Sequence, residues 1–165
     1  MNTVLLAASL LLASAPVTAA PKPSPPAPAP LEGYDGRWLL DARRSDFGGP
    51  QSALRWREDQ MTCRGEQVTV HSRYVRAGGD SVSLDYTYRA DGEATNDLRG
   101  QAVKTRGRHS GRALEFVSTI KFLVAEIRSE ERWWLAGTGD TLIREIAAHS
   151  PLGNQHQMLY FGRMR

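Results

Sequence analysis

Three side chains that could hold a ligand come together if the chain turns back on itself at Gly137-Thr138-Gly139-Asp140. A β-hairpin centred there places Trp133 opposite Arg144, with Leu142 and Arg144 on the same face and Glu131 one inward position further on. A buried arginine must be paired, because an uncompensated charge in the interior costs several kcal/mol. Trp133 can stack on the guanidinium and Glu131 can neutralise it. The pattern predicts a buried group built around Arg144.

Two interpretations of this group stay open. Arg144, Trp133 and Glu131 either anchor the carboxylate or phosphate of a ligand, or form a purely structural cluster. Three aromatic side chains on other predicted strands are further candidate ligand contacts, and the alternative is that they fill the core and leave no cavity; these are Tyr86, Tyr88 and Phe116.

A second candidate surface is basic. Lys104, Arg106 and Arg108 alternate along the chain, so they form a stripe on one face of a strand. Such a stripe suits an anionic component of the cell envelope or an acidic protein partner, which gives an interaction or inhibitor module as the alternative function. The other interpretation is a solvated outer face whose charges pair with neighbouring strands.

Catalytic and metal chemistry find little support. The four histidines are scattered and show neither an HxH nor an HExxH spacing, and no GxSxG motif is present. The third hypothesis is an enzyme whose acid/base pair would be Glu131 with His109. Cys63 is the only cysteine and lies in a predicted turn, where two interpretations are open: Arg64 lowers the pKa of the thiol, or the lone thiol is incidental. We therefore expect no catalytic residue, no metal ligand and no cofactor.

The first thirty residues predict export rather than folded structure. Residues 1–19 hold an uncharged, leucine-rich run that is too short to span a membrane and fits a signal peptide cleaved after Ala19. Residues 20–30 are rich in proline and alanine and predict a semi-rigid linker. The protein is therefore expected to be periplasmic or secreted, with its folded domain at 31–165. A net charge of +3 is too small to indicate nucleic-acid binding.

The remainder of the chain alternates apolar and polar residues, as β-strands do. We expect eight to ten short strands and no long helix; the clearest lie near 37–41, 53–58, 68–74, 82–88, 102–109, 113–122, 126–135 and 157–163. Pairing Tyr74 with Val82 or Leu84 across Gly78-Gly79 keeps one face apolar. One-sided strands bury their apolar faces best by closing into a barrel, with a β-sandwich as the alternative.

The chain also resembles lipocalin-like, calycin-type domains of exported bacterial proteins that have no assigned function. The resembling segments are Gly36-Arg37-Trp38-Leu39-Leu40-Asp41, Ser45-Asp46-Phe47-Gly48-Gly49-Pro50, Tyr88-Arg89-Ala90-Asp91-Gly92, Trp133-Trp134-Leu135, Asp140-Thr141-Leu142 and Ser150-Pro151-Leu152-Gly153. The resemblance implies an all-β, antiparallel up-and-down barrel like those of lipocalins and fatty-acid-binding proteins. It implies, by analogy of fold, a non-enzymatic protein that binds a small apolar or amphipathic ligand in its interior. The chain departs from the family in having His109 where a tryptophan often precedes the turn at Gly111.

Overall fold

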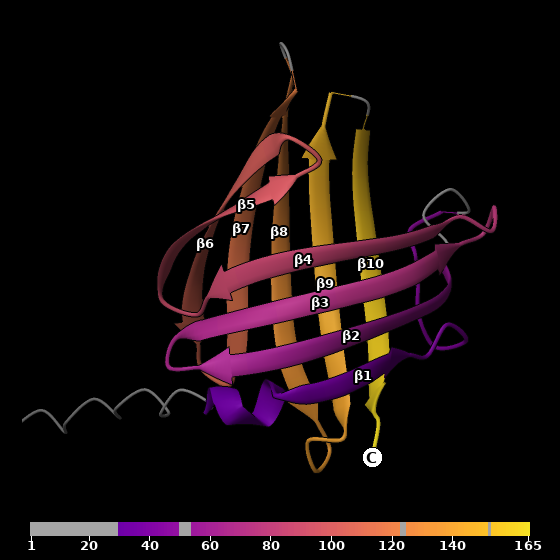
Figure 1. Ribbon diagram of the computed structural model, residues 1–165, viewed down its shortest axis with the longest axis vertical. Coiled ribbons are helices and arrows are strands. Elements are labelled where there is room, and N and C mark those ends of the chain that lie inside the picture. The colour runs from indigo at the N-terminus through magenta and orange to yellow at the C-terminus, as the bar shows by residue number, and fades with distance from the viewer. Residues whose placement is uncertain (1–29, 50–53, 123–124, 152) are drawn as a thin grey trace, which may run out of the picture.

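The computed structural model describes residues 30–49, 54–122, 125–151 and 153–165. The predicted signal peptide and all of the linker except Pro30 lie outside the described residues. A short 3-10 helix, η1 (Leu31–Tyr34), precedes ten antiparallel strands (Figure 1). The strands are β1 (Gly36–Leu40), β2 (Leu54–Arg64), β3 (Gln67–Arg76), β4 (Ser81–Arg89), β5 (Gly92–Leu98), β6 (Gln101–Ser110), β7 (Ala113–Phe122), β8 (Ala125–Ala136), β9 (Thr141–Ser150) and β10 (Gly153–Arg163).

The strands form one sheet in the order β4-β3-β2-β1-β10-β9-β8-β7-β6-β5, which curls into a nearly closed barrel. In Figure 1 the strands β1–β4 run across β6–β10, which stand behind them. The two edges of the sheet, β4 and β5, are joined by a side chain. Asn96 of β5 accepts a hydrogen bond from the Thr87 amide at 2.7 Å and donates one to the Thr87 carbonyl at 2.9 Å. The predicted up-and-down barrel is confirmed, and the β-sandwich alternative is wrong.

The β8–β9 hairpin has the predicted register. Leu135 pairs with Leu142, Trp133 with Arg144, and the turn contains Gly137 and Gly139 with φ of 61° and 90°, which glycine adopts without strain. Tyr74 pairs with Val82, one of the two predicted partners. The alternation of apolar residues therefore fixes which face of each strand points inward.

Three local expectations differ from the structure. The second strand continues to Arg64 instead of ending near 58, so Cys63 lies in β2 and not in a turn. The strand β5 is not among the expected strands, because Gly92–Leu98 contains few apolar residues and no clear alternation. Ile143 faces outward as expected but is still buried, since Trp134 and Tyr160 flank it on β8 and β10.

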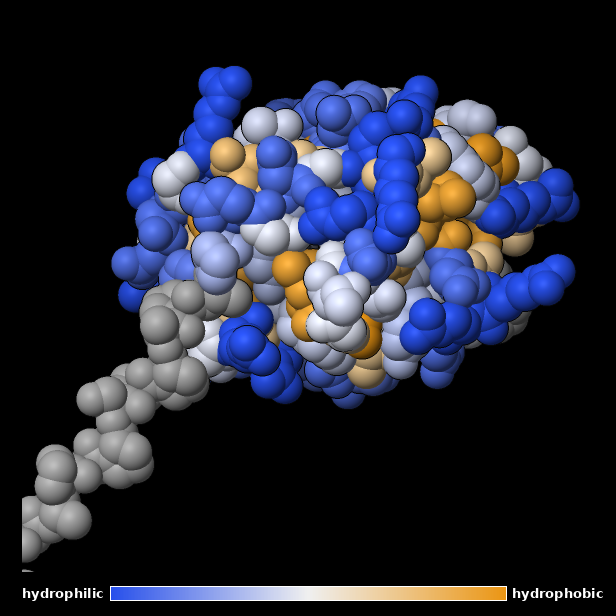
Figure 2. Space-filling model, turned by 90° about the horizontal axis from the view of Figure 1, so that it is seen from below, coloured by the Kyte–Doolittle hydropathy of each residue, from blue (hydrophilic) through white to orange (hydrophobic). Residues whose placement is uncertain are grey.

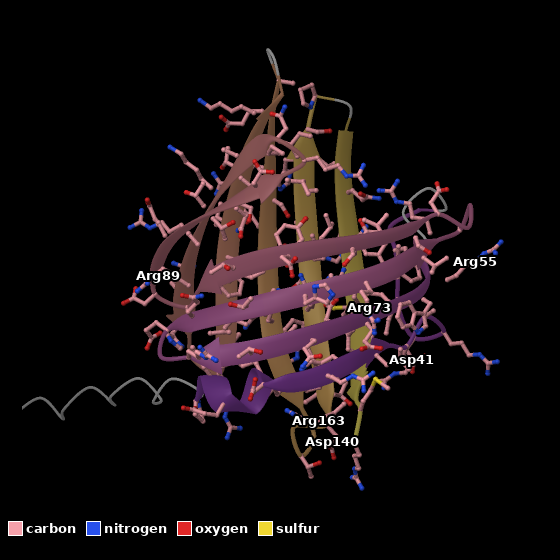
Figure 3. All side chains as sticks on the ribbon, viewed as in Figure 1. Asp41, Arg55, Arg73, Arg89, Asp140 and Arg163 are labelled. Atoms are coloured by element: carbon pink, nitrogen blue, oxygen red, sulfur yellow. The ribbon has the colours of Figure 1, made fainter. Side chains whose placement is uncertain are left out.

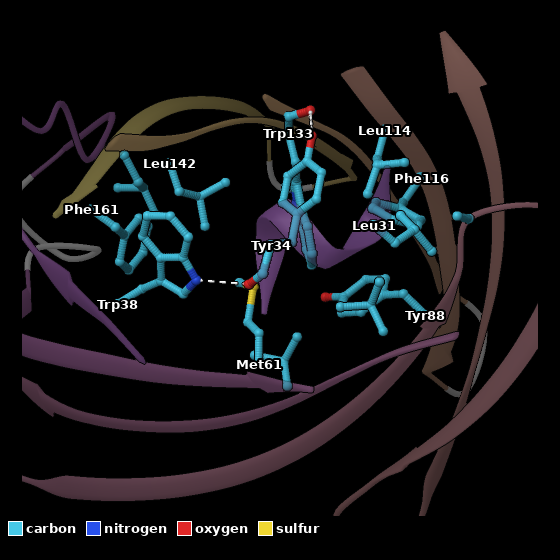
Figure 4. Close-up of a cluster of buried hydrophobic side chains, with 14 of the residues drawn as sticks. Leu31, Tyr34, Trp38, Met61, Tyr88, Leu114, Phe116, Trp133, Leu142 and Phe161 are labelled. Atoms are coloured by element: carbon cyan, nitrogen blue, oxygen red, sulfur yellow. Dashed lines mark hydrogen bonds between the residues drawn. The ribbon is translucent and has the colours of Figure 1, made fainter. Parts of the chain in front are cut away.

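Aromatic side chains pack solidly at the end of the barrel that η1 covers, drawn at the bottom of Figure 1 and called here the lower end. Trp38 donates to the Tyr34 carbonyl at 2.9 Å, and the Tyr34 hydroxyl donates to the Trp133 carbonyl at 3.2 Å (Figure 4). Arg163 holds η1 from outside, because its guanidinium lies 4.3 Å from the Trp38 ring centroid and donates to carbonyls of Gly33 and Asp35. The lower end is therefore closed.

The outer surface is polar. Arg55 and Arg89 project away from the barrel (Figure 3), and hydrophilic side chains surround smaller apolar areas on the lower face (Figure 2). The apolar faces of the strands are used inside the barrel, as the sequence predicts.

Candidate functional site

The upper part of the barrel, opposite η1, contains a cavity of about 480 Å³. Its walls come from strands on both sides of the barrel. The apolar part of the lining comprises Leu54, Val70, Leu84, Leu98, Val103, Ile120, Ile127 and Ile146, and the polar part includes Arg57, Ser72, Tyr86, Tyr88, Thr105, Ser118, Ser129, Glu131 and Arg144. A mostly apolar cavity with a few convergent polar groups is the usual form of a small-molecule site.

The polar side chains at the bottom of this cavity form a group that we call the charge cluster: Arg57, Asp59, Ser72, Glu131 and Arg144. Arg144 donates from Nη1 to Oδ2 of Asp59 at 2.9 Å and from Nη2 to Oε2 of Glu131 at 2.7 Å. Arg57 donates from Nε to Oδ1 of Asp59 at 2.8 Å and from Nη2 to Oδ2 at 2.9 Å. The Ser72 hydroxyl also donates to Asp59. Two guanidinium groups thus face two carboxylates.

The charge cluster separates the cavity from the aromatic packing below it. The Arg144 guanidinium lies 4.3 Å from the centroid of Trp133, and Trp133 Nε1 donates to Glu131 at 2.9 Å. Arg57 lies over the ring of Phe161 at 5.5 Å. Each guanidinium therefore has an aromatic ring of the core on one side and lines the cavity as well.

Ion pairing determines the charge states of the cluster. Burial alone would raise the pKa of Asp59, but the attraction of Arg57 and Arg144 outweighs it, and the pKa lies below its ordinary value. Burial alone would lower the pKa of Arg144, but Glu131 and Asp59 outweigh it and raise that pKa. Both residues are therefore ionised at neutral pH. Burial raises the pKa of the Tyr86 and Tyr88 hydroxyls, which stay protonated.

The structure brings together four of the six predicted ligand contacts. Arg144, Glu131, Tyr86 and Tyr88 line the cavity, and the predicted Arg144 pairing with Glu131 and stacking on Trp133 are confirmed as geometry. Their role in binding stays a prediction.

Trp133 and Phe116 are buried in the core and do not line the cavity. Phe116 fills the space left by Gly107, where an added Cβ would lie 2.8 Å from the Phe116 ring and 1.9 Å from the Arg89 carbonyl oxygen. Gly107 therefore lets the ring pack into the core, so that Phe116 contacts Tyr88 and Trp133 instead of the cavity.

Sequence reasoning missed Arg57, Asp59 and Ser72. Their signal was present: Arg57 and Asp59 share a parity on β2 with Met61, and Ser72 lies two positions from Val70 on β3. The predicted second strand ends near residue 58, which places Asp59 in a loop. The parity that Arg57 and Asp59 share with Met61 was therefore not recognised. A strand extended to Arg64 would have placed Arg57 and Asp59 on the face of Met61, but not next to Arg144, because that contact depends on closure of the sheet.

The other predicted surfaces remain apart from the cavity. Lys104, Arg106 and Arg108 are exposed on the outer face of β6, and Arg108 pairs with Glu115 at 2.5 Å. Their role as a surface for an anionic partner stays a prediction. His109 pairs with Glu66 at 3.1 Å, whereas Glu131 is held by Arg144 and Trp133, so the acid/base pair of the enzyme hypothesis does not form.

Of the two interpretations of Cys63, the one in which Arg64 lowers the pKa of the thiol is wrong. Burial, together with the negative charges of Asp35 and Glu32, raises the pKa of its thiol to about 11. Arg64 does not offset these effects. The thiol is thereby kept in its unreactive, protonated form.

No family model and no curated protein matches this chain. Solved structures do. The wild-type fluorescent protein UnaG superposes with a TM-score of 0.57 at 14% identity, covering 81% of this chain and 99% of that one. Zebrafish ileal bile acid-binding protein, complexed with cholic acid, gives 0.56 at 12% identity over 80% and 99% of the two chains. A Schistosoma mansoni fatty acid binding protein, complexed with arachidonic acid, gives 0.51 at 14% identity over 82% and 98%.

The chain has the fold of the fatty-acid-binding-protein-like calycin barrels. At these identities the likeness shows the fold alone. Within the described residues, no helix is long and apolar enough to cross a membrane.

Proposed function

We propose that this protein is a non-enzymatic carrier that binds a small apolar or amphipathic ligand in the upper half of its barrel. The observation that carries the proposal is the cavity of about 480 Å³, whose surface is more apolar than polar and whose bottom holds the charge cluster. Cavities of roughly 300–1,000 Å³ are typical of small-molecule sites. Two proteins of the same fold are named for the bile acid or fatty acid that they bind, which supports the same use of the interior here.

The division of the barrel into two halves explains how it could be stable without a ligand. The packed lower end supplies the core, with Trp38, Trp133 and Phe161 fully buried, and the upper cavity adds little to that packing. An apolar ligand would gain about 25 cal/mol for each Å² of apolar surface removed from water. The hydroxyls and charges at the bottom would orient it.

The proposal includes export. The predicted signal peptide at 1–19 would direct the chain out of the cytoplasm. The linker at 20–30 would then form a semi-rigid N-terminal extension of the barrel. The intact mass of the mature protein tests this. A mass that begins at Ala20 supports it, and a full-length mass with Met1 retained or simply removed contradicts it.

Native mass spectrometry of the protein purified from its own host tests ligand binding. The expected result is a bound small molecule that is released on denaturation and extracts into organic solvent. Apo protein alone, together with no binding of a neutral hydrophobic dye in solution, would contradict the proposal.

A further inference from the structure

We propose that the cavity selects ligands whose buried polar end is uncharged, such as an alcohol, a carbonyl or an amide, and discriminates against free carboxylates. This inference rests on the proposed function. It concerns the specificity of that site and follows from the charge balance of the charge cluster.

The charges at the bottom of the cavity already cancel. The side chains of Arg57 and Arg144 are 14% and 4% exposed, and those of Asp59 and Glu131 are 0% and 11% exposed. Two positive and two negative groups are paired at 2.7–2.9 Å, so the cluster is neutral. A ligand carboxylate placed here would give a buried net charge of −1 next to Glu131, which is costly where water is scarce.

The hydrogen-bonding groups that remain suit a neutral oxygen or nitrogen. Among the described residues, the Nε of Arg144 has no hydrogen-bond partner, but this atom is fully buried, so we do not count it among the groups that contact a ligand. The hydroxyls of Thr105 and Ser118 line the cavity, 2.8 Å apart, and can each donate or accept. An alcohol or amide can satisfy these groups without adding charge.

Arg76 does not alter this balance at the bottom. It also lines the cavity, but its side chain is exposed at the end of β3. The Cζ atom of its guanidinium lies 6.0 Å from the centroid of the Tyr74 ring. A carboxylate near Arg76 would remain solvated and would gain little from the pairing. We therefore expect Arg76 to have little effect on the preference between neutral and carboxylate ligands.

Competition against Nile red, a neutral dye, provides the test. An n-alkanol, the matching primary amide and the n-alkanoic acid of the same chain length are titrated into the dye complex near neutral pH. We expect the alcohol and the amide to displace the dye about tenfold or more better than the acid. Equal or better displacement by the acid in the wild-type protein would overturn the inference while leaving the proposed function standing. Failure of the dye and of all three competitors to bind would instead reject the proposed function.

The variant Glu131→Gln makes the test sharper. It removes one negative charge, and its amide oxygen can still accept from Arg144 and Trp133, so the cluster becomes net positive. We expect the preference to shift toward the acid by about tenfold or more. Glu130→Gln is the matched control, because Glu130 is exposed on the outer face of the same strand and makes the same change in net charge. The E130Q protein should prefer the alcohol and the amide over the acid to the same degree as the wild type.

An unchanged preference in a folded E131Q protein would overturn the inference, as would an equal shift in E130Q. If E131Q does not fold, the ratio measured for the wild type decides alone.

Discussion

Arg144 on β9 reaches across the interior of the barrel to Asp59 on β2, with 2.9 Å between Nη1 and Oδ2. The two strands are not neighbours in the sheet, since β1 and β10 lie between them. This ion pair therefore connects two nonadjacent strands across the interior of the barrel. It lies between the packed core of the lower end and the cavity above it. Both side chains are almost completely buried, so they stay charged through their ion pairs: Asp59 with Arg57 and Arg144, and Arg144 with Glu131 and Asp59.

Removing the guanidinium should be costly for folding. Arg144→Met leaves Asp59 with Arg57 as its remaining charged partner and leaves Glu131 without a cation. We expect the free energy of unfolding to fall by about 3–5 kcal/mol, measured by urea denaturation. Arg106→Met, at an exposed position on β6, is the control and should change it by less than about 0.5 kcal/mol. Equal effects of the two variants would show that the pair across the barrel is not structural.

The same ion pairs predict how stability depends on pH. Burial would raise the pKa of Asp59, but Arg57 and Arg144 lower it below its ordinary value of 3.8. A carboxyl whose pKa is lower in the folded state stabilises the protein above its unfolded pKa, and this contribution is lost as the pH falls through the folded pKa. The difference in unfolding free energy between wild type and Asp59→Asn should therefore be largest at neutral pH and shrink below about pH 4. A difference that grew on acidification would contradict the lowered pKa.

Asn96 should hold the two edges of the sheet together. Its side-chain amide makes two hydrogen bonds to Thr87, one in each direction, where no ladder links β4 and β5 in the described structure. We expect Asn96→Ala to lower the free energy of unfolding by about 1–3 kcal/mol and to speed hydrogen exchange of the Thr87 amide. Thr95→Ala, at the exposed neighbouring position, should do neither. Unchanged protection of Thr87 in N96A would show that the edges are closed by other contacts.

Cys63 should react slowly while the protein is folded. A pKa of about 11, against an ordinary value of 9.0, reduces the thiolate fraction near pH 8 by roughly 100-fold. Labelling with iodoacetamide, followed by mass spectrometry, should be slower by about that factor in the native protein than in urea. Comparable rates in the two states would contradict the raised pKa.

Much of the fold and part of the charge cluster could be predicted from the sequence. The β8–β9 register follows from the glycines of its turn and from Leu135 and Leu142, and it correctly places Trp133, Glu131 and Arg144 together. The partners from β2 and β3 could not be derived in this way. Asp59 meets Arg144 only because the sheet closes, and the distance between nonadjacent strands depends on the curvature of the barrel and not on local alternation.

The extent of the cavity could not be predicted from the sequence either. The sequence predicts that Tyr86, Tyr88 and Phe116 point into the barrel, but not at which position along the barrel axis each side chain lies. Because Gly107 has no side chain, the Phe116 ring can pack against it in the core of the lower end. Ile127 and Ser129 instead line the cavity. Such a division depends on the packing of side chains from several strands at once.

Filling the cavity with a large side chain should abolish ligand binding inside the barrel. Ser129 lines the cavity and is flanked in register by the small residues Ser118 and Ala148, so Ser129→Trp can fill the space without displacing a strand. Ser83→Trp places the same ring on the outer surface of β4. In a Nile red titration we predict saturable binding to wild type and to S83W, and a loss of affinity of about tenfold or more in S129W. Unchanged affinity in S129W, or no binding to the wild-type protein, would show that the interior of the barrel is not a binding site.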